Sequence, residues 1–248
     1  QNIQKQQQRE LDKLSEIAKL TATEHTQIQE GARQLLIAIS SAPNVSQGAS
    51  TNCSTFLKNL IANYIRYSNF GVVNRQGQIL CAANINTAKQ NPPSLELINN
   101  TLNSNSFTTG TYYSIKPTGA VINFAYPLNK ESVVYASLSL DWVDNFVNNL
   151  NSSPNLVINI LDQRGTVLAR SPKNETATGQ NFATDPLVQE ILAKGNGQTT
   201  KIGIDQVQRL YSFSSLDKNK TTFIAVGIPK TNLDQIKQQS LALSLLTI

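Results

Sequence analysis

The sequence predicts an α+β fold: a long N-terminal helix followed by two similar modules, each a five-stranded antiparallel sheet with flanking helices. Two observations lead to this prediction. Residues 1–42 contain no proline and place apolar side chains at helical spacing. Further along the chain, apolar segments and their turns recur in the same order at a nearly constant offset, which indicates a duplicated module.

The N-terminal helix is assigned to residues 1–42. Its apolar positions recur every three residues, at Leu11, Leu14, Ile17 and Leu20. A helix of about 40 residues reaches about 60 Å, which is longer than a small domain needs. We interpret it as a stalk that supports dimerisation or carries a signal. The alternative is a helix packed along its own domain, and both can hold together. His25 is expected to be exposed on this helix.

The first module is assigned to residues 43–153. A helix around Phe56 is followed by a β-hairpin, residues 70–81, whose turn ends at Gly77. Glycine suits this position because hairpin turns require a positive φ. Three further strands complete the predicted sheet, two of them in the apolar segments 120–128 and 134–141. A polar segment at 151–154 ends the module.

The second module, residues 154–230, repeats this plan. Its hairpin turn ends at Gly165, 88 positions after Gly77. Residues 207–216 match 120–128, and residues 223–230 match 134–141. Residues 231–248 are predicted to form a C-terminal helix leading toward a transmembrane segment, since they end in the apolar run LALSLLTI and the chain has no methionine.

Composition excludes several classes of function. With 40% apolar and 15% charged residues, the chain is too apolar to be disordered. The net charge of +5 is spread along the sequence without a basic block, so no nucleic-acid partner is expected. A single histidine argues against a His-rich metal site or a His-based triad. We find no activated nucleophile, metal constellation or phosphate-binding loop, and therefore predict no enzyme, cofactor or metal in this fragment.

The order and spacing of these segments resemble the double Cache (tandem PAS-like) extracytoplasmic sensor domain of bacterial transmembrane receptors. The segments that carry the resemblance are Cys53–Leu57, Tyr67–Cys81, Ile122–Pro127, Leu138–Trp142, Asp162–Arg170, Gly179–Gln180, Arg209–Phe213 and Val226–Lys230. The similarity is greatest to members fused to histidine kinases or cyclases. It implies a periplasmic module, anchored through its parent chain, that binds a small molecule in its membrane-distal first module and passes occupancy inward through its terminal helices.

The resemblance also implies a ligand site between the first sheet and residues 88–102. This covering segment, with Asn91, Pro92 and Pro93, is expected to be irregular and polar. Amino-acid-binding members carry an arginine where this chain has Asn91, and an aspartate that Asp141 matches. Without the arginine we expect a neutral or cationic ligand, such as an amine, with Asp141 as its counter-charge. Asp141 is alternatively the N-cap of the helix that follows it. The predicted ligand-binding residues are Asp141, Tyr112, Asn123, Asn91 and Tyr126. Tyr126 is also interpreted as structural, and only one of Tyr112 and Tyr113 can face the site.

Three further expectations follow for an exported receptor fragment. Spacing alone cannot pair Cys53 with Cys81, but export favours one disulfide between them. Arg170 is expected to close the second module through Asp162 or Asp185. The N-terminal helix is expected to support parallel self-association into a homodimer, most firmly in the full-length receptor. Two functions remain open: a small-molecule sensor module, or a spacer or protein-interaction domain that binds no ligand.

Overall fold

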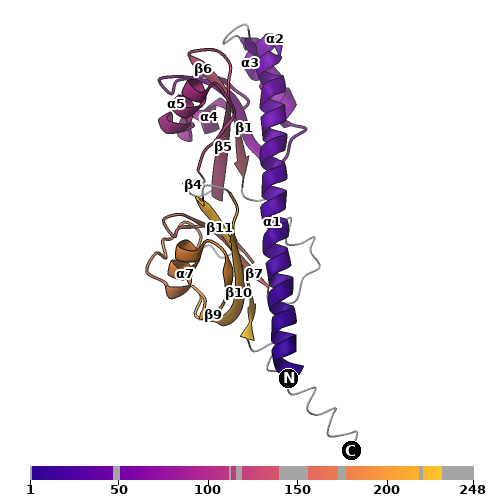
Figure 1. The fold of residues 1–248 in the computed structure, drawn as a ribbon. Coiled ribbons are helices and arrows are strands. Elements are labelled where there is room, and N and C mark those ends of the chain that lie inside the picture. Colours follow the sequence, from indigo (N-terminus) through magenta and orange to yellow (C-terminus); the bar gives the residue numbers. More distant parts are fainter. Residues whose placement is uncertain are drawn as a thin grey trace, which may run out of the picture. The chain divides into compact units, whose positions relative to one another are not determined.

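The computed structural model describes residues 2–46, 51–111, 113–115, 119–139, 156–172, 177–217 and 220–230. The described residues group into two compact units (Figure 1). One contains residues 26–139, and the other contains residues 2–25 together with 156–230. We call the sheet-containing parts of these units the first module and the second module.

Helix α1 (Asn2–Ser41) supplies residues to both units. Its buried side chains alternate at spacings of four and three residues: Leu14, Ala18, Thr21, His25, Ile28 and Ala32. This is the stripe of an amphipathic helix packed on its own chain. Leu20, by contrast, is 47% exposed. The expectation that His25 is exposed was wrong, because His25 belongs to the buried stripe and is only 1% exposed.

Within its described residues, the first module contains six strands and four short helices. In chain order they are α2 (Pro43–Ser46), α3 (Thr51–Ile61), β1 (Tyr67–Asn74), β2 (Ile79–Ala82), α4 (Ile85–Gln90), α5 (Leu95–Ser104), β3 (Thr108–Thr109), β4 (Tyr113–Ile115), β5 (Gly119–Pro127) and β6 (Ser132–Ser139). The sheet order is β2-β1-β6-β5-β3, and β4 also pairs with β5. The predicted fifth strand is therefore split into two short pieces, both antiparallel to β5.

The second module contains five strands and one helix in the described residues. They are β7 (Val157–Asp162), β8 (Val167–Ser171), α7 (Pro186–Lys194), β9 (Gly197–Ile202), β10 (Gln208–Ser215) and β11 (Thr222–Pro229). The order β8-β7-β11-β10-β9 repeats that of the first sheet, and every pairing is antiparallel. The predicted duplication of an antiparallel sheet is confirmed.

Each sheet buries one face against a helix of its own module (Figure 1). In the first module, Leu97 and Ile98 of α5 pack on Val73, Ala125 and Tyr135 of the sheet. In the second module, Leu187, Val188 and Ile191 of α7 pack on a cluster that includes Tyr211 and Phe213. The two hairpin glycines adopt the positive φ that the turns require, 81° at Gly77 and 79° at Gly165.

The predicted disulfide is present. Cys53 on α3 is bonded to Cys81 on β2, and both side chains are buried. The bond ties the helix to the edge strand of the first sheet and closes a chain segment with a sequence separation of 28.

Candidate ligand-binding face of the first module

A row of three polar side chains crosses the middle of the first sheet. Asn69 on β1 pairs with Ser137 on β6, and Ser137 pairs with Asn123 on β5. Residues paired across neighbouring strands lie on the same face of a sheet, so all three share one face. They are 1%, 5% and 2% exposed, respectively. Buried polar groups of this kind need hydrogen bonds, and their partners define what the row can do.

Helix α5 covers the face that carries this row. Tyr135 and Ala125 lie two positions from Ser137 and Asn123 along their strands, so they point to the same side. Both pack against Leu97 and Ile98 of α5. The polar row therefore lies on the same face as these apolar contacts with α5, two positions further along the strands.

Asn69 has a structural task. Its amide nitrogen donates to the backbone carbonyl of Asn84 at 2.9 Å, and its carbonyl oxygen accepts from the Asn84 backbone N–H at 3.0 Å. Asn84 in turn is the N-cap of α4 and accepts a hydrogen bond from the backbone N–H of Thr87. Asn69 thereby fixes the start of α4 over the sheet.

Asn123 and Ser137 form the remaining pair of the row. The Ser137 hydroxyl donates to the Asn123 side-chain oxygen at 2.6 Å. This bond orients the Asn123 amide group, because its oxygen is held by the serine. Asn123 is a predicted ligand-binding residue, and it lies on the face toward α5.

The backbone at Gly110 closes one end of this face. A Cβ at residue 110 would lie 3.0 Å from the backbone oxygen of Asn123 and 3.3 Å from Leu97 Cδ2. The Gly110 N–H also donates to the Asn123 carbonyl at 2.8 Å. A side chain at this position would therefore make unusually tight contacts with both β5 and α5.

The structure describes two of the other predicted residues, Tyr126 and Asn91. Tyr126 is three positions from Asn123 on a regular strand, so it faces the opposite side of the sheet. Asn91 is the C-cap of α4, where its backbone N–H donates to the Thr87 carbonyl. Asp141 and Tyr112 lie outside the described residues. The geometry therefore does not bring Tyr126 and Asn123 together.

The segment that covers the face differs from expectation. Residues 88–102 were predicted to be irregular and polar, whereas most of them belong to helices α4 and α5. Two caps explain this. Asn84 accepts from Thr87 N–H, and Ser94 accepts from Leu97 N–H, so each helix starts at a side chain suited to that position. Leu97, Ile98 and Thr101 then present a buried face to the sheet.

Sequence reasoning missed Asn69 and Ser137 as members of a polar row. The signal was present in the sequence. Each residue is a polar side chain within an apolar strand, at the position where alternation places it on the same face as its neighbours. The register between strands, which aligns the residues, could not be read from the sequence.

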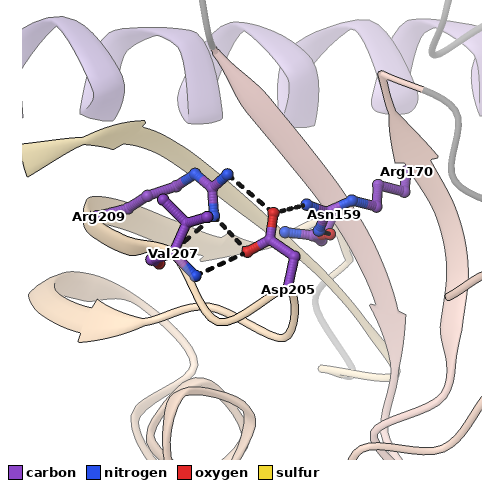
Figure 2. A network of polar contacts seen from close by, with 5 residues as sticks. All are labelled: Asn159, Arg170, Asp205, Val207 and Arg209. Carbon is purple, nitrogen blue, oxygen red and sulfur yellow. Dashed lines mark hydrogen bonds and ion pairs between the residues drawn. The ribbon is translucent and has the colours of Figure 1, made fainter. Parts of the chain in front are cut away.

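The second module holds a polar network on its corresponding face (Figure 2). Arg170 donates to the Asn159 side-chain oxygen at 2.6 Å and to Asp205 Oδ2 at 2.6 Å. The expected partners of Arg170 were wrong. Asp162 instead accepts from the backbone N–H groups of Arg164 and Thr166 in its own turn, and Asp185 caps α7.

Ionisation of Asp205 is favoured within this network. Burial raises the pKa of its carboxyl group, but hydrogen bonds and charge from Arg209, together with the charge of Arg170, outweigh burial and lower the pKa below its ordinary value. Asp205 is therefore an anion at neutral pH and holds both arginines.

The described residues show neither a candidate metal site nor a candidate membrane span. No group of three or more His, Cys, Asp or Glu side chains there could hold a metal ion. None of the described helices combines the length and apolar character needed to cross a membrane.

Comparison with known proteins shows a shared fold at low sequence identity. No protein-family model matches the sequence, and no curated protein matches it. Among solved structures, the extracellular domain of rpHK1S-Z16, described as a histidine kinase, superimposes with a TM-score of 0.71 at 15% identity, covering 91% of this chain and 96% of that one.

Two further structures have established receptor names. The sensor domain of the V. cholerae histidine kinase DctB gives a TM-score of 0.66 at 13% identity, covering 91% of this chain and 99% of that one. The periplasmic sensory domain of the Campylobacter jejuni chemoreceptor Tlp1 gives 0.64 at 14% identity, covering 90% and 95%. The chain has the fold of extracytoplasmic receptor sensor domains, as its sequence predicted.

Proposed function

We propose that this chain is an extracytoplasmic small-molecule sensor module of a transmembrane signalling receptor. Its fold is that of receptor sensor domains, over nearly the whole length of each. The observation that carries the proposal is the buried Asn123–Ser137 pair on the sheet face beneath α5. A few placed polar groups among apolar side chains are what small-ligand sites use to orient a ligand.

The ligand is a neutral or cationic small molecule, such as an amine. Asn123 and Ser137 offer polar groups without charge, which suits a neutral contact. Asp141, at the end of the same sheet in sequence, supplies the counter-charge for a cationic group, and Tyr112 and Asn91 add contacts at the edge of the site. The parent protein is a membrane-anchored receptor, with a histidine kinase or cyclase as its output.

A thermal-shift screen tests the proposal. Neutral and cationic metabolites are added to the purified chain, and a ligand of the native state raises its melting temperature by mass action. Ser137→Ala removes the hydroxyl that orients Asn123 and is expected to weaken binding about tenfold. Asp141→Ala is expected to abolish binding, and Asp141→Asn to weaken it. Tyr126→Phe, on the opposite sheet face of the same strand, is the matched control and should bind like the wild type.

A spacer that binds no ligand is the alternative, and one observation favours it. The Asn69 amide is used entirely by the backbone of Asn84, and the Asn123 oxygen is held by Ser137. Polar rows can serve to fix a sheet and its helices. If no compound in the screen shifts the wild type, the spacer function is supported instead. If Tyr126→Phe loses the shift as fully as Ser137→Ala, the ligand does not bind at the Asn123–Ser137 pair.

Dimerisation through α1 is proposed on its exposed face. The stripe with Leu14 and Ala18 is buried on its own chain, which leaves the side with Leu20 and Gln27 for a second copy. Cysteines placed at Leu20 and Gln27 in the full-length receptor should give disulfide-linked dimers, and a cysteine at Ala18 should not. Absence of dimers at both exposed positions would remove this proposal.

A further inference from the structure

The second module gathers four buried polar side chains on the sheet face that α7 covers. Arg170 on β8, Asn159 on β7, and Arg209 and Tyr211 on β10 are between 0% and 6% exposed. Asn159 and Arg170 are register partners, and Tyr211 belongs to the cluster that packs on α7. Asp205 reaches the same place from the turn between β9 and β10 (Figure 2).

The charges in this group do not balance. Arg209 holds Asp205 with both terminal nitrogens, Nη2 meeting Oδ2 at 2.8 Å, and Arg170 holds the same carboxylate at 2.6 Å. Two guanidinium groups therefore share one carboxylate. Two other described carboxylates of the module have partners of their own, Asp162 in its turn and Asp185 at the start of α7. Within this described group, one positive charge is left in a buried place, where unpaired charge is costly.

Two hydrogen-bond donors of the group have no acceptor among the described residues. They are Arg209 Nε and the Tyr211 hydroxyl, and both atoms are buried. Burial raises the pKa of Tyr211, although the neighbouring Arg209 charge opposes the effect, so the hydroxyl keeps its proton and remains a donor. A guanidinium has five N–H donors in a planar fork, and Asp205 engages only its terminal nitrogens.

Gly203 brings the turn backbone against this group. A Cβ at residue 203 would lie 2.2 Å from the Tyr211 hydroxyl and 3.1 Å from both Arg209 Nη1 and Asp205 Oδ1. A side chain at this position would collide with the tyrosine, so glycine is required for the turn to place Asp205 beside the two arginines.

We propose that Arg209 Nε and the Tyr211 hydroxyl bind a small carboxylate beside Asp205, with Arg170 contributing charge. A carboxylate carries one negative charge, which balances the group, and two acceptor oxygens, which match two donors. Chloride balances the charge but offers no pair of oxygens at a fixed spacing. This site lies in the second module and does not depend on the ligand site proposed for the first.

Acetate is the probe that tests this site. Sodium acetate is titrated into the purified chain against sodium chloride at equal ionic strength, with melting temperature and isothermal calorimetry as readouts. We expect saturable binding of acetate and no saturable binding of chloride. Tyr211→Phe should weaken acetate binding at least about tenfold, since a hydrogen bond to a charged group is lost. Asp205→Asn should tighten it, because a competing negative charge is removed.

Tyr135→Phe is the matched control, because Tyr135 is a buried tyrosine packed over a strand glycine in the first module. It should bind acetate like the wild type. No acetate-specific signal, equal affinity in the wild type and Tyr211→Phe, or weaker binding in Asp205→Asn would each overturn the proposal. If Ser137→Ala abolishes the acetate signal while Tyr211→Phe keeps it, acetate binds in the first module, which refutes this site and supports the proposed function.

Discussion

The two modules share a strand order but use the matching positions of their sheets differently. In the first, the register row Gly71, Tyr135 and Ala125 crosses β1, β6 and β5. In the second, Asn159, Ala225 and Phe213 cross β7, β11 and β10. These rows correspond, because each starts three positions before the equivalent hairpin turn residues Asn74 and Asp162.

The candidate site of the first module and its counterpart in the second lie two positions away from these rows on each strand. Asn123 on β5 corresponds to Tyr211 on β10, and Ser137 on β6 corresponds to Gly227 on β11. In the second module the tyrosine ring lies over that glycine, where a Cβ would be 2.4 Å from the ring. An aromatic ring thus fills the place where the first module keeps its polar pair.

Both modules nevertheless place a tyrosine over a strand glycine. In the first, Tyr135 covers its register partner Gly71, and a Cβ there would be 2.5 Å from the ring. The tyrosine lies on β6 in the first module and on β10 in the second, but in both modules it packs over a glycine of the neighbouring strand. The comparison teaches that the strand that carries the tyrosine decides which positions of the sheet face remain for polar side chains.

The first module is cross-linked by a disulfide, whereas the second is held by the ion pairs of Asp205. The largest predicted effect is that of removing the disulfide. Replacing both Cys53 and Cys81 by serine removes the constraint on a segment with a separation of 28 residues. The chain-entropy model gives a loss of about 3–4 kcal/mol. Hydrogen exchange should show faster exchange in peptides of α3 and β2, with peptides of β7 to β11 unchanged. Equal loss of protection in both modules would contradict independent closure.

Breaking the ion pairs of Asp205 is expected to destabilise the second module slightly less than loss of the disulfide destabilises the first. Asp205→Ala leaves Arg170 and Arg209 buried without their carboxylate, which should cost about 3 kcal/mol, at the low end for a broken buried pair because Asp205 is partly exposed. Exchange should accelerate in β8 and β10 only. Glu190→Gln, which breaks exposed ion pairs of α7, is the control and should change stability by less than about 1 kcal/mol.

The glycine–tyrosine packing gives a third test with an intermediate effect. Gly71→Ala and Gly227→Ala each force a methyl group into a tyrosine ring and should destabilise their own module by about 1–3 kcal/mol. Gly31→Ala is the control, since a Cβ there meets nothing within 4 Å. Urea unfolding measures the three variants. An effect of Gly31→Ala as large as the others would show that helix or strand propensity, not the ring contact, is responsible.

The smallest predicted effect is a pH dependence from His25. Burial lowers the pKa of His25, although Asp217 and the backbone of Leu216 partly oppose it. The folded state therefore binds the proton less well than the unfolded state. The stability contribution is complete above pH 6.5 and is lost as the pH falls toward the lowered pKa. His25→Gln should flatten the melting temperature between pH 7 and 5, and an unchanged slope would exclude this histidine as the cause.

The sequence was sufficient for the fold because the signals were local or repeated. The hairpin turns ending at Gly77 and Gly165, and the strands around them, recur at a constant offset, and each requires only near neighbours in the chain. The helix caps Asn84 and Ser94 were equally local and could have corrected the prediction for residues 88–102.

The candidate site was only partly predictable because it depends on register and distant partners. Alternation was enough to separate Tyr126 from Asn123, but the alignment of Asn69 with Ser137 needs the pairing of strands far apart in sequence. Arg170 contacts Asp205 across a sequence separation of 35 residues. The turn that carries Asp205 has a geometry that no local sequence pattern predicts. His25 was misplaced because a three-residue spacing was followed instead of the alternating spacing of four and three that the buried stripe has.

The tyrosine rings over Gly71 and Gly227 also have an evolutionary consequence. Each glycine can change to a larger residue only if its tyrosine becomes smaller in the same lineage, since the two occupy one volume. Homologous chains should therefore show these positions changing in pairs, Gly71 with Tyr135 and Gly227 with Tyr211. Exchanging one member alone would carry the chain through an unstable intermediate, so each pair is expected to change together and independently of the other pair.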